Sequence, residues 1–229
     1  MSRRFLHVLA LAAALACVPA QAAEHLVVTG GPSLRRWENL RVPRDRHDNW
    51  WANFVRASTL RMIELRRAYG PSARIVWIVY RPGYRARGAE DGKPYVTWIS
   101  DLARKHNASL VWIDSGNGLI QAINSRPQRS VVTFDYFGHS NRYCFMLDYS
   151  NVIMAACTAW VHERDLGHIR GSVFARNAYC KSWGCHTAES MSKVWRRRVG
   201  VPLEGAIGST DYVVVGQGRL PGIVGRWAR

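Results

Sequence analysis

Residues 75–80 read Ile-Val-Trp-Ile-Val-Tyr, a continuous apolar run in which β-branched residues dominate. Such a run is typical of a β-strand covered on both faces, because a half-exposed strand alternates apolar and polar residues. Similar short apolar runs occupy 26–29, 110–113, 131–136, 178–183 and 203–207, and helical segments are predicted at 51–69, 94–103, 119–123 and 189–198. Six strands alternating with helices predict an α/β fold, a three-layer α/β/α sandwich around a mostly parallel six-stranded sheet.

The chain begins with the pattern of an export leader. Arg3 and Arg4 precede an apolar stretch at 5–18, and Ala20-Gln21-Ala22 has the small residues that signal peptidase recognises. We therefore predict a signal peptide at 1–22 and a single secreted or periplasmic domain at 23–229. Lipid anchoring through Cys17 is not favoured, because the leucine usually found three residues before such a cysteine is absent. No later segment reaches about 18 apolar residues, so no transmembrane segment is expected after cleavage.

The chain is strongly basic, with 32 Lys and Arg against 16 Asp and Glu, which gives a formal net charge of +16. This excess favours contact with a polyanion, such as an acidic polymer of the cell envelope. Nucleic acid is a less favoured partner, because the basic residues are scattered and no nucleic-acid motif accompanies them.

Two segments are predicted to lie outside the regular elements: a polar excursion at about 32–48 and a basic Gly/Arg tail at about 216–229. Residues 81–92 are expected to form a loop, and Asp48 is expected to cap the helix at 51–69.

Two loops carry the residues best suited to chemistry. In each, an apolar or aromatic strand runs to a glycine that a reactive side chain follows at once: Gly138-His139 and Gly184-Cys185. Loops at the carboxyl ends of parallel strands are where α/β sheets place their chemistry. With the helix at 189–198 starting close behind it, Cys185 is expected to have its thiolate favoured by the helix dipole. An imidazole one strand away could take the thiol proton and later protonate a leaving amine.

Other uses of these residues remain open. The four cysteines after the leader (Cys144, Cys157, Cys180 and Cys185) could form two disulfides, and a Cys180–Cys185 bond would remove the nucleophile. His139 alone could be a buried structural histidine. No metal is expected, because the His and Cys residues lack the spacing of zinc ligands. The glycines at 30–31 and 116–118 could cradle phosphate, but neither pair matches a nucleotide-binding fingerprint, and no cofactor is expected.

The order strand-Gly-His, strand-Gly-Cys, helix, Val-Pro strand resembles the caspase–gingipain–legumain class of cysteine peptidases. The stretches Gly184-Cys185-His186-Thr187-Ala188-Glu189-Ser190 and Gly200-Val201-Pro202-Leu203-Glu204-Gly205-Ala206 are also similar to caspase-like domains of bacterial surface proteins. The resemblance implies a caspase-like fold that acts on a peptide or protein substrate. It implies that Cys185 is the nucleophile and His139 the general base, with the backbone N–H groups of Ser140 and Cys185 as the oxyanion hole.

The sequence departs from the family pattern at two places. Ser140 stands where the family has a glycine after the histidine, and Ala188 replaces the glycine of the turn after the cysteine. The specificity pocket is not defined, because Asp135, Asp148 and Asp211 could each lie at its base. Two hypotheses follow: a secreted cysteine peptidase-like hydrolase with a Cys185–His139 dyad, or a non-catalytic basic domain that holds an acidic polymer on the same scaffold.

Overall fold

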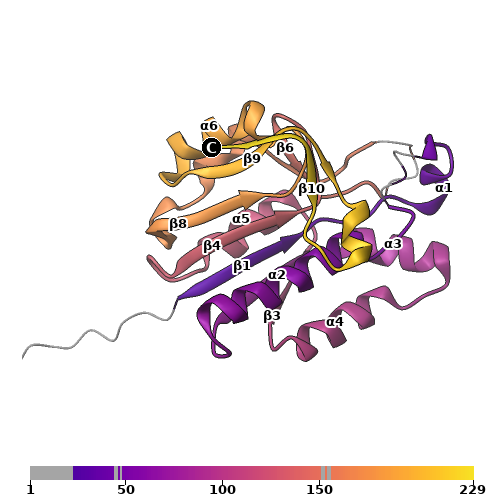
Figure 1. Cartoon of the computed structure of the whole chain (residues 1–229), viewed down its shortest axis with the longest axis horizontal. Helices are drawn as coiled ribbons and strands as arrows, with labels where there is room; N and C mark the ends of the chain where they lie inside the picture. The colour runs from indigo at the N-terminus through magenta and orange to yellow at the C-terminus, as the bar shows by residue number, and fades with distance from the viewer. Residues whose placement is uncertain (1–22, 44–45, 47, 151–152, 154–155) are drawn as a thin grey trace, which may run out of the picture.

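The computed structural model describes residues 23–43, 46, 48–150, 153 and 156–229, so the predicted leader and Cys17 lie outside the described residues. A seven-stranded sheet forms its centre, in the order β10-β9-β8-β4-β1-β2-β3 (Figure 1). Six strands are parallel, and β10 is antiparallel to β9. Their bounds are β1 (Glu24–Thr29), β2 (Arg74–Tyr80), β3 (Ser109–Ile113), β4 (Val131–Phe137), β8 (Phe174–Ser182), β9 (Leu203–Asp211) and β10 (Gly222–Ala228). The expected six-stranded sheet is therefore a mixed sheet of seven strands.

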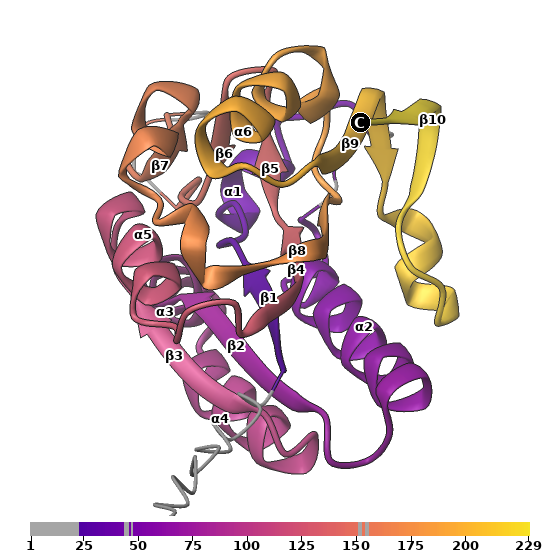
Figure 2. The same ribbon diagram turned by 90° about the vertical axis from the view of Figure 1, so that its left-hand side faces the viewer.

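Helices cover both faces of the sheet, so the α/β class and its layers are as expected. The helices are α1 (Arg35–Glu38), α2 (Asn53–Tyr69), α3 (Arg81–Asp91), α4 (Tyr95–Lys105), α5 (Gly116–Asn124) and α6 (Met191–Val199). One apolar core packs α5 and α6 against one face, and a second core packs α2, α3 and α4 against the other. Figure 2 shows α5 and α2 on opposite sides of the sheet. In the part of the chain that the structure describes, no helix is both long and apolar enough to span a membrane.

Two segments outside the predicted elements are regular. Residues 81–92, expected to be a loop, contain α3, which starts with Pro82 in its first turn and ends at Gly92 in a left-handed conformation. The tail at 216–229 contains β10, which extends the sheet along the edge of β9. Trp227 of β10 lies 5.5 Å from Trp183 between ring centroids, and the ammonium of Lys181 lies between the two rings. These contacts hold the tail against the sheet despite its glycines and arginines.

A small second sheet takes two of its three strands from the stretch 142–172, for which the sequence pattern predicts no element. It has the order β5-β6-β7, with β5 (His139–Ser140), β6 (Cys144–Met146) and β7 (Trp160–His162) all antiparallel. Because β5 follows β4 after only Gly138, this sheet fixes the loop that carries His139. Short 3₁₀ segments at Glu163–His168, Gly171–Val173, Thr187–Glu189 and Val213–Gln217 complete the described part of the chain.

The order of the parallel strands places a switch point between β1 and β4. From β1, the chain adds β2 and β3 on one side, and then returns to add β4, β8 and β9 on the other side. The loops that leave β1 and β4 therefore diverge to opposite faces of the sheet. The crevice between them at the carboxyl edge is the usual ligand site of an open α/β sheet.

Candidate active site

The predicted histidine and cysteine lie beside this switch point, at the carboxyl ends of β4 and β8. His139 follows β4, Cys185 follows β8, and both line a small cavity of about 40 Å³. The other lining residues are Phe54, Gly138, Ser140, Thr210 and Tyr212. Among the described residues, no hydrogen bond joins the Cys185 thiol to the His139 ring. Such bonds are often long in an unliganded enzyme and shorten when substrate binds.

His139 is held by a buried carboxylate that the sequence analysis did not assign to the site. Its Nε2 lies 2.7 Å from Oδ2 of Asp48, a fully buried residue 91 positions earlier in the chain. The ring is also packed edge-on against Phe54 at 5.1 Å and against Tyr149 at 4.5 Å between centroids. Because an ionised carboxylate only accepts hydrogen bonds, Nε2 carries the proton and Nδ1 is left as the basic nitrogen.

Asp48 is kept ionised by its surroundings. Burial alone would raise its pKa, but the charge and hydrogen bond of His139, with N–H donors from Ser33 and Asn53, lower the pKa to about 2. The donor distances are 2.5 Å from the Ser33 backbone N–H and 2.7 Å from Asn53 Nδ2. These contacts outweigh the desolvation of the carboxylate. The result is a fixed negative charge at the back of the imidazole.

Asp48 lies at the end of the polar excursion predicted at about 32–48. This excursion is not a free surface loop, because buried side chains bond to it. The backbone N–H of Asp48 donates to Glu38, which is buried, and burial raises the pKa of Glu38. Arg87 of α3 is also fully buried, and its Nη1 donates to the carbonyl oxygens of Ser33 and Asp48, both at 2.8 Å. The predicted N-cap role of Asp48 is wrong, because α2 begins after Ala52 without a side-chain cap. The only sequence signal for it was an acid at the end of the arginine-rich excursion, shortly before a predicted helix.

Cys185 lies in a loop that takes the place of β8 along the edge of β9. The two strands pair only through Cys180–Leu203 and Lys181–Glu204, and beyond them β9 bonds to the cysteine loop instead. The His186 N–H donates to the Gly208 carbonyl at 2.8 Å. The thiol sulfur accepts from the Thr210 backbone N–H at 3.3 Å, and it lies 3.4 Å from the Thr210 hydroxyl. Thr210 is thus a second site residue that the sequence analysis missed.

The expected helix dipole does not act directly on Cys185. A 3₁₀ turn at Thr187–Glu189 separates the cysteine from α6, and the first N–H of α6, from Met191, donates to the Arg142 carbonyl. The backbone N–H and the hydroxyl of Thr210 contact the Cys185 sulfur in place of the N–H groups expected from the helix N-terminus. His186 adopts a left-handed φ of 60°, which costs about 1 kcal/mol for a residue other than glycine. Glu189 holds this turn, because its Oε1 lies 2.6 Å from His186 Nδ1 and accepts from the Gly208 N–H.

Among the described residues, the pairing of their loops leaves free the two backbone N–H groups expected to form the oxyanion hole. In the β5–β6 pair, His139 and Asn141 form the hydrogen-bonded positions, so the Ser140 N–H points away from β6. In the described part of the chain, the Cys185 N–H has no hydrogen-bond partner. The Ser140 hydroxyl donates to the Cys185 carbonyl at 2.6 Å, so the serine side chain is directed at the cysteine loop.

Gly184 lets the two loops approach each other. A Cβ at this position would lie 2.2 Å from the Ser140 hydroxyl and 2.9 Å from the Gly138 carbonyl oxygen. We expect Gly184→Ala to push the loops apart, to destabilise the fold by about 1–3 kcal/mol and to slow alkylation of Cys185. The matched control is Gly167→Ala, because a Cβ there meets nothing within 4 Å. Thermal unfolding and iodoacetamide labelling measure both effects, and an unchanged labelling rate in Gly184→Ala would contradict the role given to this contact.

The disulfide considered between Cys180 and Cys185 is not formed. Both are free thiols, as are Cys144 and Cys157. Cys180 is buried in the apolar core on β8, whereas Cys185 lies beyond the end of the strand against Thr210. Burial holds the pKa of the Cys180 thiol well above its usual range. Among the described residues, no group of three or more His, Cys, Asp and Glu side chains could hold a metal ion.

The three candidate specificity aspartates do not line the cavity. Asp135 is fully buried on β4, where it accepts from Arg61 at 3.0 Å and from the Trp183 indole at 2.9 Å. Asp148 binds Ser150 within its own loop, and Asp211 accepts from the Val213 N–H. Each of the three carboxylates is therefore bonded to another part of the protein and does not face the cavity that His139 and Cys185 line.

The glycine pairs considered as phosphate cradles are occupied by close packing. The N–H groups of Gly30 and Gly31 donate to the carbonyls of Phe137 and Leu147. A Cβ at Gly116 would lie 1.9 Å from the Trp160 carbonyl oxygen. These glycines let neighbouring segments pack closely. Gly30 and Gly31 do so across the switch point between β1 and β4.

Comparison of the chain with protein-family models, with curated proteins and with solved structures finds no match.

Proposed function

We propose that the protein is an exported cysteine peptidase-like hydrolase of the caspase–gingipain–legumain kind, in which Cys185 is the nucleophile and His139 the general base. The observation that carries the proposal is the hydrogen bond from His139 to the buried Asp48 carboxylate, in a cavity that Cys185 also lines. A histidine that only fills space in a core needs no ionised acid as a hydrogen-bond partner. Burying an ionised carboxylate costs free energy, so its presence next to His139 favours a functional role. A base oriented by a third group beside a thiol is the arrangement of covalent acyl-transfer catalysis.

In the proposed mechanism, Nδ1 of His139 takes the proton of the Cys185 thiol, and the thiolate attacks the carbonyl carbon of the substrate. The carbonyl electrons move to the oxygen, which accepts hydrogen bonds from the N–H groups of Ser140 and Cys185. When the C–N bond breaks, Nδ1 returns its proton to the leaving amine, and a thioester remains on Cys185. Water then attacks the thioester with Nδ1 as base, releasing the acid and restoring the thiol. Asp48 stays ionised throughout and stabilises the imidazolium.

The test is the rate of iodoacetamide labelling at each cysteine of the folded protein, read by peptide mass mapping. We expect Cys185 to label at least about ten-fold faster than Cys144 at neutral pH, because only the thiolate reacts. Cys144 is the internal reference, since burial raises its pKa to about 11. In His139→Ala, the Cys185 rate should fall by about ten-fold, because the base is lost. Equal rates at the two cysteines, or a Cys185 rate that His139→Ala leaves unchanged, would contradict the dyad.

A further inference from the structure

We propose that the edge of the sheet opposite the candidate active site is a docking surface for an anionic lipid bilayer. We call this surface the basic edge, and define it by Arg74, Arg129, Arg170, Arg176 and the last turn of α6 (Arg196, Arg197 and Arg198). All seven side chains belong to exposed residues. The proposal does not depend on whether Cys185 is reactive.

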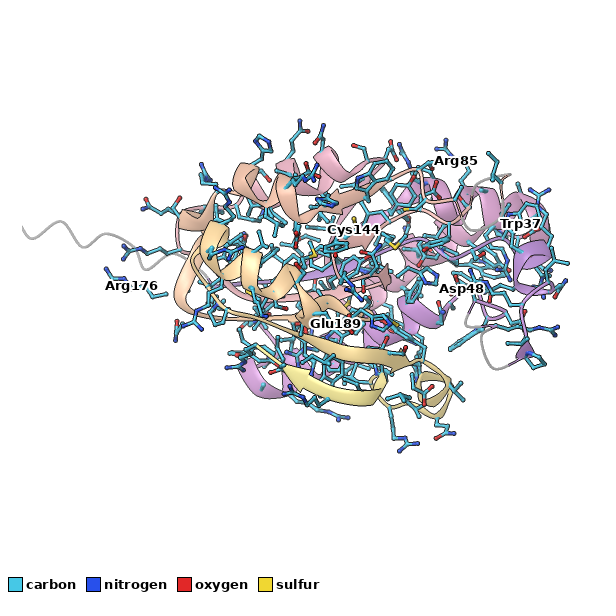
Figure 3. All side chains as sticks on the ribbon, turned by 90° about the horizontal axis from the view of Figure 1, so that it is seen from above. Trp37, Asp48, Arg85, Cys144, Arg176 and Glu189 are labelled. Atoms are coloured by element: carbon cyan, nitrogen blue, oxygen red, sulfur yellow. The ribbon has the colours of Figure 1, made fainter. Side chains whose placement is uncertain are left out.

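The topology gathers these residues from distant parts of the chain. Arg74 is the first residue of β2, and Arg176 lies near the start of β8. Arg129 precedes β4, and its backbone N–H donates to the Ser172 carbonyl at 2.8 Å. The last turn of α6 reaches the same edge, because a Cβ on Gly171 would lie 2.2 Å from the Val199 carbonyl oxygen. In Figure 3, Arg176 lies at one end of the molecule and Asp48 lies toward the other.

The helix dipole explains only part of this charge. Basic residues in the last turn of a helix interact favourably with its C-terminal carbonyls, and this accounts for the arginines of α6. It does not account for Arg74, Arg129, Arg170 and Arg176, which lie at strand starts and in loops. Arg129 even adopts a left-handed φ of 57°, where glycine or asparagine would be less strained. The charge at this edge therefore exceeds what the helices require.

Most of the basic edge lacks acidic partners. Glu24 is buried at the start of β1 and pairs with Arg74 at 3.4 Å and with Arg126 at 3.8 Å. Within the described residues, no carboxylate lies at ion-pair distance from Arg129, Arg170, Arg176 or the arginines of α6. Unpaired guanidinium groups on one face attract an anionic surface, and each contributes to the attraction independently of sequence-specific contacts.

The centre of the basic edge is also fixed in place. Arg170 donates through Nη2 to the Arg126 carbonyl and through its backbone N–H to Asn124 Oδ1, both at 2.7 Å. Asn124 in turn donates to the His168 carbonyl at 2.8 Å. Loops that are bonded to one another keep their charges in one face, so binding a surface costs little additional ordering.

The position of the N-terminus favours a bilayer over a soluble polyanion. β1 begins at Glu24, so any segment before residue 23 joins the domain at the basic edge. The predicted leader at 1–22 therefore holds this edge of the domain near the membrane until the leader is cleaved. After cleavage, the arginines of the basic edge can remain bound to anionic headgroups. Because His139 and Cys185 lie at the opposite edge of the sheet, a docked domain keeps its cavity open to solution.

The test uses residues 23–229, which contain every helix and strand described above, and vesicles that carry about one third phosphatidylglycerol in phosphatidylcholine. We expect sedimentation with these vesicles, none with pure phosphatidylcholine, and a steep loss of binding with added salt. The triple variant Arg176→Gln, Arg196→Gln, Arg197→Gln should bind about 100-fold more weakly, since each basic residue contributes about five-fold. The matched control is Arg85→Gln, Lys93→Gln, Arg219→Gln, which removes the same charge at exposed positions outside the basic edge.

Circular dichroism and the Cys185 labelling rate are measured for both triple variants. Values equal to those of the parent exclude unfolding as the cause of a lost affinity. Equal binding of the two variants would overturn the proposal, because the attraction would then follow net charge alone. Binding of the parent to duplex DNA without binding to the anionic vesicles would also overturn it, and would assign the basic edge to a nucleic acid.

Discussion

The Cys185→Ala protein should fold as the parent does and lose all measurable peptide hydrolysis. The expected loss is on the order of 10⁵–10⁶-fold in turnover, the size seen when the nucleophile of an acyl-transfer enzyme is removed. Folding should be nearly unaffected, because the thiol is only partly buried and its bonds are to the Thr210 N–H and hydroxyl. The matched control is Cys144→Ala, another partly buried free thiol that lies on β6 outside the cavity.

Hydrolysis is measured as new peptide N-termini in a digest of denatured proteins, compared between parent and variants, and folding as the thermal midpoint. If Cys185→Ala cuts as well as the parent, the nucleophile is assigned wrongly. If Cys144→Ala loses cleavage to the same extent, the effect belongs to thiol loss in general and not to the cavity.

The second large effect is expected from Asp48→Asn. An asparagine has one acceptor oxygen, whereas Asp48 accepts bonds from three donors: His139, the Ser33 N–H and Asn53. An amide nitrogen in the place of Oδ2 faces the donors of His139 and Ser33 and forces His139 into the other tautomer, whereas one in the place of Oδ1 faces the Asn53 amide. We expect turnover to fall by about 10³–10⁴-fold, as when the buried acid of a catalytic triad is neutralised. Stability should fall by about 1–3 kcal/mol, the cost of a buried unsatisfied donor.

The pH dependence of stability distinguishes Asp48 from other buried acids. Its pKa is about 2 in the folded protein, below the ordinary value of about 3.9, so ionised Asp48 stabilises the fold above about pH 4. This stabilisation is lost as pH falls toward 2. The difference in unfolding free energy between parent and Asp48→Asn should therefore shrink over that range, as denaturant titrations at several pH values measure. A difference that stays constant would show that Asp48 is not ionised.

Asp135→Asn is the matched control for burial, because Asp135 is also fully buried but bonds to Arg61 and Trp183 outside the cavity. This variant should lose stability and keep the parent's Cys185 labelling rate, whereas Asp48→Asn should lose both. Equal labelling in Asp48→Asn and the parent would contradict a role for Asp48 in orienting His139.

Two fold elements could not be predicted because their sequences resemble those of irregular segments. The run 81–92 contains Gly83 and Gly88, which read as loop residues. In the folded protein, a Cβ on Gly83 would lie 2.9 Å from Gly31 Cα, and one on Gly88 would lie 2.6 Å from the Lys93 carbonyl oxygen. These glycines therefore serve close packing inside and beside a helix. A glycine selected for packing cannot be told from a turn glycine until its neighbours are known.

The C-terminal strand was hidden for a related reason. An edge strand needs only one neighbour, so the alternation of polar and apolar residues in 222–228 is weak. Its place is set by Trp227, which packs on Trp183 and on the ammonium of Lys181. Lys181 belongs to β8 and Trp183 follows it directly, so no pattern within 222–228 predicts the contact.

The six parallel strands, the helices between most of them and the common edge for His139 and Cys185 are predictable from the sequence. This follows from physics that is local: the period of apolar residues fixes each element, and parallel strands end at the same side of a sheet. Three features are visible only in the folded chain: Asp48 supports His139, Thr210 binds the thiol, and scattered arginines form one edge. Those contacts join residues up to 91 positions apart. A hydrogen-bond partner at that separation depends on the path of the whole chain, which no window of sequence contains.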